Sequence, residues 1–238
     1  MEGRASRPSG RVGTPGSPPG TPETRQAASL PLFRAMQLPR LYAILDAACF
    51  RDAAGMFAAA SELATAGVTL LQYRDKSGNA RRMVQEAREL RARLGENVKL
   101  IMNDRADLCL AAQYDGLHVG QDDLSPDSAR SIIGPARWLG VSTHNPEQLA
   151  EADKISADYL AIGPVFATTS KTNPDPVVGL EGIGRARELT RKPLVAIGGI
   201  TRANARSVIE AGADAVAVIS DLLLDPGKSA EEFLRILR

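Results

Sequence analysis

The stretch Tyr114-Asp-Gly-Leu-His-Val-Gly120 decides the fold, because the chain repeats it in kind at two later places. Ala157-Asp-Tyr-Leu-Ala-Ile-Gly163 and Ala213-Asp-Ala-Val-Ala-Val-Ile219 have the same order of an aspartate and a short apolar run. We interpret each stretch as the end of a helix, a tight turn and a buried strand. The chain therefore repeats a strand–helix unit.

Outward from these stretches, short apolar runs recur along the chain and segments with helical spacing separate them. One such segment has an apolar stripe made by Met83, Ala87, Leu90 and Leu94. Eight nearly continuous apolar runs in about 200 residues predict an α/β fold, a parallel TIM (β/α)8 barrel. The runs are Leu41–Leu45, Val68–Gln72, Lys99–Met102, Gly116–Val119, Trp138–Val141, Tyr159–Ile162, Pro193–Ile197 and Ala215–Ile219.

A doubly wound open parallel sheet is the alternative fold. It is disfavoured because no Gly-x-Gly-x-x-Gly motif follows the first run. Ser125-Pro126 and Asn145-Pro146 predict helix starts, with a capping residue before a proline. Ser229 and Glu232 have the spacing of a capping box for a last helix.

Residues 1–37 differ from the rest in composition, because Arg, Ser, Gly and Pro dominate them. Such a segment buries too little apolar area to offset the entropy lost on ordering. We predict a disordered tail at 1–37 and a barrel domain at 38–238. An organellar transit peptide is the alternative, since acidic residues are scarce, but the proline and glycine content argues against an amphipathic helix.

The bulk properties of the chain exclude several kinds of partner. A formal net charge of +1 for 238 residues gives no reason to expect nucleic acid or an anionic membrane. No apolar run approaches the roughly 18 residues of a membrane span, and no signal-peptide core is visible. Cys49 and Cys109 are isolated among small or apolar neighbours, and we interpret them as buried free thiols of a cytoplasmic protein. The sequence leaves open whether the chain forms a homo-oligomer.

The active site of such a barrel lies at the carboxyl ends of the strands. Gln72, Arg74 and Lys76 occupy alternate positions of the stretch Leu70–Lys76, so they point to one side of an extended chain. Two cations and an amide side by side predict a receptor for a polyanion, most simply a diphosphate. The alternative is a solvated strand end whose charges form ion pairs.

Two aspartates follow neighbouring predicted strands. Asp104 comes after the third run, and Asp123 follows Gln121-Asp122 after the fourth run. Carboxylates that converge beside cations suit Mg²⁺, which takes a few carboxylates, waters and phosphate oxygens. Asp104 and Asp123 are therefore candidate Mg²⁺ ligands. The alternative is that each of them caps the helix that follows it.

The last strand ends carry a second polar set. Gly198-Gly199 follows the seventh run and is expected to open onto a helix near Thr201, where backbone N–H groups can meet an anion. Ser220 follows the eighth run, and barrels often bind a phosphate between these two strands. We expect a monophosphate site here, against the alternative of a glycine turn required by packing alone.

The two histidines differ in their surroundings. His118 lies inside a predicted strand, between Leu117 and Val119, and is interpreted as a hydrogen-bonded residue of the barrel interior. His144 comes at a strand end, where it is either an acid–base group or a polar residue of the rim. No Ser-His-Asp or Cys-His constellation is evident.

From about Leu41 to its end, the chain resembles the thiamine phosphate synthase (thiamine-phosphate pyrophosphorylase) family. The set of motifs is specific in its order and spacing. It comprises Gln72-Tyr-Arg-Asp-Lys76, Asn103-Asp-Arg105, Gly116-Leu-His-Val-Gly-Gln-Asp-Asp123, Gly140-Val-Ser-Thr-His144, Gly163-Pro-Val-Phe166 and Val195-Ala-Ile-Gly-Gly-Ile200.

The resemblance implies a Mg²⁺-dependent transferase that joins a hydroxymethylpyrimidine diphosphate to a thiazole phosphate and releases pyrophosphate. By similarity, the pyrimidine diphosphate would be held by Gln72, Arg74, Lys76, Asn103, Ser142 and Lys171. Asp104 and Asp123 would bind Mg²⁺. The thiazole phosphate would be held by Thr168, Thr169, Ser170, Gly199, Ile219 and Ser220.

Three cations, Arg74, Lys76 and Lys171, are the expected catalytic groups, since they can stabilise charge on the leaving pyrophosphate. The chain departs from the family at Thr168-Thr-Ser-Lys171, where Thr-x-Thr-Lys is usual. Ser170 keeps the hydroxyl and lacks a methyl group, so binding is expected with altered tightness.

Two other functions are considered for the same barrel. A related thiazole tautomerase would use His144 and would have no need of Arg74, Lys76, Asp104 and Asp123. A catalytically silent barrel could bind a phosphorylated ligand as a sensor. The full charged set argues against both alternatives.

Overall fold

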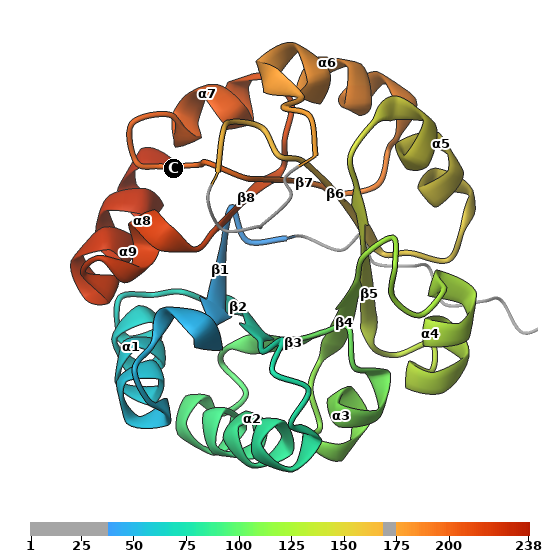
Figure 1. Cartoon of the computed structure of the whole chain (residues 1–238). Helices are drawn as coiled ribbons and strands as arrows, with labels where there is room; N and C mark the ends of the chain where they lie inside the picture. Colours follow the sequence, from blue (N-terminus) through green and yellow to red (C-terminus); the bar gives the residue numbers. More distant parts are fainter. Residues whose placement is uncertain (1–37, 169–174) are drawn as a thin grey trace, which may run out of the picture. The chain divides into compact units, whose positions relative to one another are not determined.

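The computed structural model describes residues 38–168 and 175–238, which form a closed barrel of eight parallel strands (Figure 1). Each strand pairs with its neighbours in chain order, and β8 closes onto β1. The strands are β1 (Leu41–Asp46), β2 (Leu70–Arg74), β3 (Lys99–Asn103), β4 (Gly116–Val119), β5 (Trp138–Thr143), β6 (Tyr159–Ile162), β7 (Leu194–Ile197) and β8 (Ala215–Val218).

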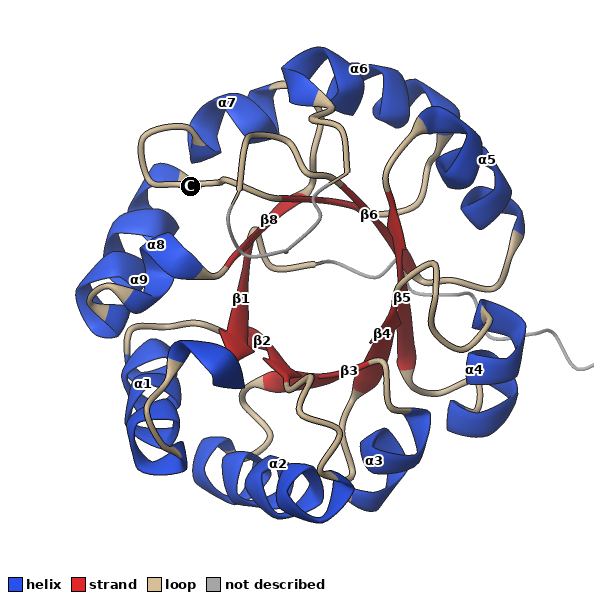
Figure 2. Ribbon diagram, viewed as in Figure 1, coloured by secondary structure: helices blue, strands red, loops and turns tan. Residues whose placement is uncertain are grey.

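A ring of helices surrounds the strands (Figure 2). The helices are α1 (Ala53–Thr65), α2 (Ala80–Leu94), α3 (Ala106–Ala111), α4 (Pro126–Ile133), α5 (Pro146–Lys154), α6 (Gly179–Leu189), α7 (Ala205–Glu210), α8 (Ser220–Leu223) and α9 (Pro226–Ile236), with a 3-10 turn at Ala47–Cys49. Within 38–168 and 175–238, no helix has both the length and the apolar character needed to cross a membrane.

All eight expected strands are confirmed, and the closed sheet shows that the open-sheet alternative is wrong. The differences lie at the strand ends. β2 begins at Leu70 rather than Val68 and continues to Arg74, and β5 continues to Thr143. Several residues expected after the strands therefore belong to their last positions. The predicted tail, 1–37, lies outside the described residues, so its disorder and its boundary with the barrel stay predictions.

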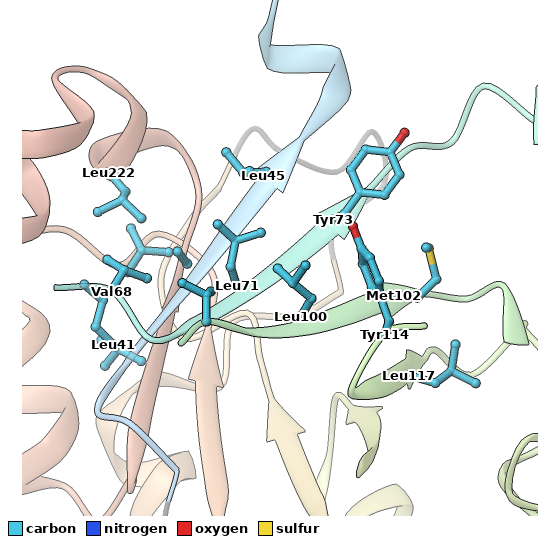
Figure 3. Close-up of a cluster of buried hydrophobic side chains, with 14 of the residues drawn as sticks. Leu41, Leu45, Val68, Leu71, Tyr73, Leu100, Met102, Tyr114, Leu117 and Leu222 are labelled. Atoms are coloured by element: carbon cyan, nitrogen blue, oxygen red, sulfur yellow. The ribbon is translucent and has the colours of Figure 1, made fainter. Parts of the chain in front are cut away.

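Two apolar layers follow from the alternation of side chains along each strand. In β1, Tyr42 and Ile44 point into the barrel, where they pack with Leu70 and Tyr159. The intervening Leu41, Ala43 and Leu45 belong to the larger outer layer between strands and helices. Figure 3 shows part of this outer layer, including Leu41, Leu45, Leu71, Leu100, Tyr114 and Leu222.

Local signals for helices are confirmed in most places. The stripe of Met83, Ala87, Leu90 and Leu94 is buried along α2. Ser125 and Asn145 each cap a helix with a side-chain oxygen, and a proline follows each cap. The capping box at Ser229 is wrong, because α9 begins at Pro226 and Ser229 lies buried within the helix.

The three repeated stretches owe their similarity to one structural device, which we call the aspartate clamp. In each, an aspartate stands directly before one strand and accepts a hydrogen bond from a backbone N–H of the strand that precedes it in the chain. An arginine from the helix that leads into this earlier strand bonds to the same carboxylate. The sets are Asp115 with Leu100 and Arg91, Asp158 with Leu139 and Arg130, and Asp214 with Leu194 and Arg187. Each clamp thus ties one helix to two strands.

Candidate active site

The carboxyl ends of β2, β3 and β4 bring together one lysine and two aspartates. Lys76 forms an ion pair with Asp104, and its Nζ lies 4.0 Å from Oδ1 of Asp123. The two carboxyl groups lie close enough for each to shift the pKa of the other. Burial, together with the nearby Asp123, raises the pKa of Asp104 above its usual range. Two acidic groups and a cation therefore share one small region, as the sequence predicts.

The backbone places Asp104 in an uncommon conformation. Its φ angle is 60°, in the left-handed region that aspartate tolerates better than most residues. Its backbone N–H donates to the carbonyl oxygen of His118 at 2.8 Å, which holds it against β4. Such conformations cost free energy and persist where the surrounding structure enforces them, often at functional sites.

Neither aspartate caps a helix, so the alternative interpretation of both residues is wrong. The N-cap of α3 is Arg105, without a side-chain bond, and the N-cap of α4 is Ser125. Oδ2 of Asp123 accepts a hydrogen bond from Gly120 N–H at 2.8 Å, within its own loop. The neighbouring Asp122 is exposed.

This pair of carboxylates suits a hard cation that takes most of its oxygens from elsewhere. In the described part of the chain, no three or more His, Cys, Asp or Glu side chains form a group that could hold a metal ion. Mg²⁺ does not need such a cage, because waters and substrate phosphates complete its coordination. Asp104 and Asp123 are the residues that could hold it here.

Arg74 is held by a residue to which the sequence assigns no role. Its guanidinium forms an ion pair with Asp46, whose side chain is 7% exposed against 25% for Arg74. Asp46 Oδ1 also accepts a hydrogen bond from Ala48 N–H at 3.1 Å. Asp46 of β1 lies directly opposite Arg74 of β2 in the strand register. Pairing these two strands in the expected barrel could therefore have predicted the contact.

The barrel interior contains a continuous line of hydrogen-bonded side chains below the site, which we call the interior chain. It runs from Gln72 through Tyr42, Tyr159 and His118 to Ser142. His118 uses both ring nitrogens in this line, which confirms that it is a hydrogen-bonded interior histidine. Burial lowers the pKa of His118 to about 4, so its imidazole is neutral at pH 7. Sequence reasoning missed Tyr42 and Tyr159.

Asn103, at the end of β3, has an unused donor. Its Nδ2 atom is buried and has no hydrogen-bond partner in the described structure. A buried donor without a partner is costly, so a ligand acceptor at this point would stabilise the site. This observation agrees with the expected place of Asn103 beside an oxygen-rich substrate.

The backbone of the glycine pair after β7 packs closely against the segment that follows β6. Gly198 and Gly199 have φ angles of 100° and 63°, and a Cβ atom on Gly199 would lie 2.5 Å from the carbonyl oxygen of Ala167. The helix expected near Thr201 begins only at Ala205, because a turn closed by Asn204 comes first. Close packing is therefore one reason for a glycine at position 199.

The other expected residues of the second site are placed only in part. Thr168 is half-buried at the end of the described segment after β6, Ile219 precedes α8, and Ser220 begins that short helix. Thr169, Ser170 and Lys171 lie outside the described residues. His144 is tied to the rim, with Nδ1 at 2.6 Å from the carbonyl oxygen of Gly163 and 3.5 Å from Oδ2 of Asp175.

Comparison with known proteins decides the family. The sequence profile described as thiamine monophosphate synthase matches residues 41–222. The chain belongs to this family.

Members of the thiamine monophosphate synthase family from distant organisms align with nearly the whole barrel. The chain is 62% identical over 205 residues to the thiamine-phosphate synthase of Koribacter versatilis, covering 85% of this chain and 97% of that protein. It is 44% identical to the synthase of Chloroflexus aurantiacus, covering 83% and 92%. The solved thiamine phosphate pyrophosphorylase of Pyrococcus furiosus superposes with a TM-score of 0.75 and 34% identity, covering 83% and 95%.

The resemblance seen in the motifs is thereby confirmed. The chain is a transferase of thiamine biosynthesis. These relatives are named as synthases, so they support neither an isomerase nor a silent binding barrel.

Proposed function

We propose that this enzyme joins a hydroxymethylpyrimidine diphosphate to a thiazole phosphate, with Mg²⁺ as its metal. The observation that carries the proposal is the convergence of Lys76, Asp104 and Asp123 at adjacent strand ends. The neighbouring Arg74 adds a second cation for the same diphosphate. In this assignment the substrates are small molecules. Cys109 is buried as predicted, whereas Cys49 is exposed, so the predicted burial of Cys49 is wrong. Both thiols are free, which fits a cytoplasmic enzyme.

In the reaction, the bond between the pyrimidine methylene carbon and the diphosphate oxygen breaks, and pyrophosphate leaves with the electron pair. The thiazole nitrogen then forms a bond to the same carbon and gives thiamine phosphate. The aminopyrimidine ring can donate electrons to the methylene cation. No protein nucleophile is needed, so the residues have to bind, orient and stabilise charge.

Charge on the leaving pyrophosphate is the main quantity to be stabilised. Mg²⁺, when bound, neutralises part of that charge. Asp104 and Asp123 would hold the ion, and Lys76 lies beside both carboxylates and can turn to the diphosphate. Arg74 is already fixed in place by Asp46. Lys171 is proposed as a third cation because it matches the family motif.

The thiazole phosphate is assigned to the other side of the site. Thr168, Gly199, Ile219 and Ser220 come from the segments after β6, β7 and β8, where barrels commonly bind a phosphate. Thr169 and Ser170 are assigned by the family motif alone. Gln72, Asn103 and Ser142 would bind the pyrimidine diphosphate, and the unpartnered Nδ2 of Asn103 supports this assignment.

A synthesis assay with matched variants tests the proposal. Both substrates are mixed with enzyme and Mg²⁺, and thiamine phosphate is quantified. We expect Asp104→Asn and Asp123→Asn to lose most turnover with little change in melting temperature, since each removes one candidate ligand charge. Asp122→Asn is the control, because Asp122 is an exposed neighbour in the same loop. Full activity with unchanged Mg²⁺ dependence in both variants would contradict the metal assignment.

A further inference from the structure

The interior chain crosses the barrel from β2 to β5 with every link at hydrogen-bond distance. Gln72 Nε2 donates to the Tyr42 hydroxyl at 2.9 Å, and the Tyr42 and Tyr159 hydroxyls are 3.0 Å apart. The Tyr159 hydroxyl lies 3.1 Å from Nδ1 of His118. Nε2 of His118 lies 2.8 Å from Oγ of Ser142. The two ends, Gln72 and Ser142, are both proposed contacts of the pyrimidine diphosphate.

Packing holds the members of the interior chain in place. Tyr42, Tyr159 and Gln72 are 3% exposed or less, and His118 is 8% exposed. The His118 and Tyr159 rings are stacked, with centroids 5.6 Å apart. A Cβ atom on Gly140 would lie 2.0 Å from Cζ of Tyr159, so the glycine of β5 makes room for this ring. The side chains of the interior chain are therefore held in fixed positions by the packing around them.

Each hydroxyl carries one proton, and this fixes the direction of the hydrogen bonds. Because Tyr42 accepts from Gln72, its own proton goes to Tyr159, and the proton of Tyr159 goes to Nδ1 of His118. The neutral imidazole then carries its proton on Nε2 and donates it to Ser142. The reverse direction requires the Gln72 amide to be turned over.

We propose that the interior chain sets the hydrogen-bonding polarity of the two substrate contacts at its ends. Gln72 presents its Oε1 as an acceptor, because Nε2 donates one of its two N–H groups to Tyr42 and this bond fixes which way the amide faces. Ser142 presents its O–H as a donor, because Oγ already accepts from His118. Tyr42, Tyr159 and His118 are positioning residues, since they act through these two side chains.

This inference rests on the proposed function for the identity of the ligand. An acceptor at Gln72 selects a donor such as the exocyclic amino group of the pyrimidine. A donor at Ser142 selects a ring nitrogen or a diphosphate oxygen. A site that is built to hydrogen-bond a substrate group discriminates strongly against an analogue that lacks it, because its own polar groups are then left unpaired.

Nitrogen NMR of the histidine side chains tests the direction without any substrate. The chain has only 2 histidines, so two side-chain patterns have to be assigned, with His118→Gln identifying one of them. We expect the His118 tautomer with the proton on Nε2, and a change in its Nδ1 signal in Tyr159→Phe. The tautomer with the proton on Nδ1 would overturn the proposed polarity, whether or not the enzyme makes thiamine phosphate.

Kinetics of matched variants test the positioning role. We expect Tyr159→Phe to raise the KM for the pyrimidine diphosphate about tenfold, the effect of losing about one aligned hydrogen bond, and to leave the KM for the thiazole phosphate unchanged. His118→Leu should act like Tyr159→Phe, while His118→Gln, which keeps a donor near Ser142, should restore part of the affinity. Tyr114→Phe is the control, because the buried Tyr114 hydroxyl has no partner in the described structure and lies in the outer layer (Figure 3).

The preference of the enzyme for the amino group of the pyrimidine is a further test, because a purely structural role of Tyr159 would leave this preference unchanged. A pyrimidine diphosphate analogue with hydrogen in place of the amino group is tested as a competitive inhibitor. The native enzyme should prefer the amino compound, and Tyr159→Phe should lose about tenfold of that preference because the Gln72 amide is free to turn. Equal KM changes for both substrates, or unchanged selectivity in a folded Tyr159→Phe enzyme, would overturn the positioning role.

Discussion

Replacing Asp158 by alanine should lower the free energy of unfolding by about 3 kcal/mol, a sum of two losses in the aspartate clamp. The first loss is the acceptor of Leu139 N–H, which lies 2.7 Å from Oδ2 of Asp158. Leu139 is fully buried, so its N–H would be left without a partner at a cost of about 2 kcal/mol.

The second loss is the ion pair with Arg130, whose side chain is 17% exposed against 25% for Asp158. Arg130 keeps three backbone carbonyl acceptors, those of Gly134, Arg137 and Ser156. Its charge therefore stays partly solvated, and the loss should be about 1 kcal/mol rather than the value for an unpaired buried charge. Asp158→Asn keeps an acceptor oxygen for Leu139, so it should lose only this second part.

Urea unfolding followed by fluorescence measures both variants, because Trp138 is the one tryptophan of the chain and lies at the start of β5. Asp122→Ala is the control, as an exposed aspartate outside any clamp. Synthesis at saturating substrate should be unchanged, since the clamp lies at the amino ends of the strands. Equal destabilisation by alanine and asparagine, or less than about 0.5 kcal/mol for alanine, would refute the division of the clamp energy into these two parts.

Three further predictions concern charge and the tail. Asp46→Asn removes the ion-pair partner of Arg74, so the KM for the pyrimidine diphosphate should rise several-fold while that for the thiazole phosphate stays constant; an unchanged pyrimidine KM would contradict the role of Asp46. Burial alone would raise the pKa of Asp115, but hydrogen bonds from Leu100, Lys99 and Arg91 outweigh it and lower the pKa. The stabilisation from Asp115 is therefore present above the ordinary aspartate pKa of about 4 and lost as the pH falls through the lowered value, so the difference in urea midpoint between the native chain and Asp115→Asn should shrink between pH 5 and pH 3. Removal of residues 1–37 should leave activity and melting temperature nearly unchanged, and a large drop in melting temperature would show that the tail packs on the barrel.

The strands and the polar residues at their ends could be predicted because both are local in sequence. The runs of apolar residues mark the eight strands, and the alternation in Leu70–Lys76 places Gln72 and Arg74 on one face. Contacts across the closed barrel could not be predicted in this way. Tyr42 and Tyr159 are 117 positions apart, and each looks like an apolar strand residue until closure brings their hydroxyls together.

Two predicted helix starts were wrong, because each pattern left more than one residue at which the helix could begin. The capping-box spacing of Ser229 and Glu232 is real, but Pro226 starts α9 earlier, and Glu232 bonds to Arg202 instead. A helix was expected to open near Thr201 after Gly198-Gly199, but Asn204 closes a turn first and α7 begins at Ala205. In both cases the sequence pattern is compatible with a helix start, and a neighbouring residue places the start elsewhere.

Aspartates at the two ends of this barrel have different surroundings. At the amino ends, the carboxylates of Asp115, Asp158 and Asp214 each bond to a backbone N–H and an arginine, so their charges stabilise the fold. At the carboxyl ends, Asp104 has a left-handed backbone and a raised pKa beside Asp123. Lys76 is the cation beside this carboxylate in the structure, and the proposed Mg²⁺ would supply a further positive charge to it. Because the clamps hold helices and strands together at the opposite end, the site can keep this unfavourable arrangement without loss of the barrel.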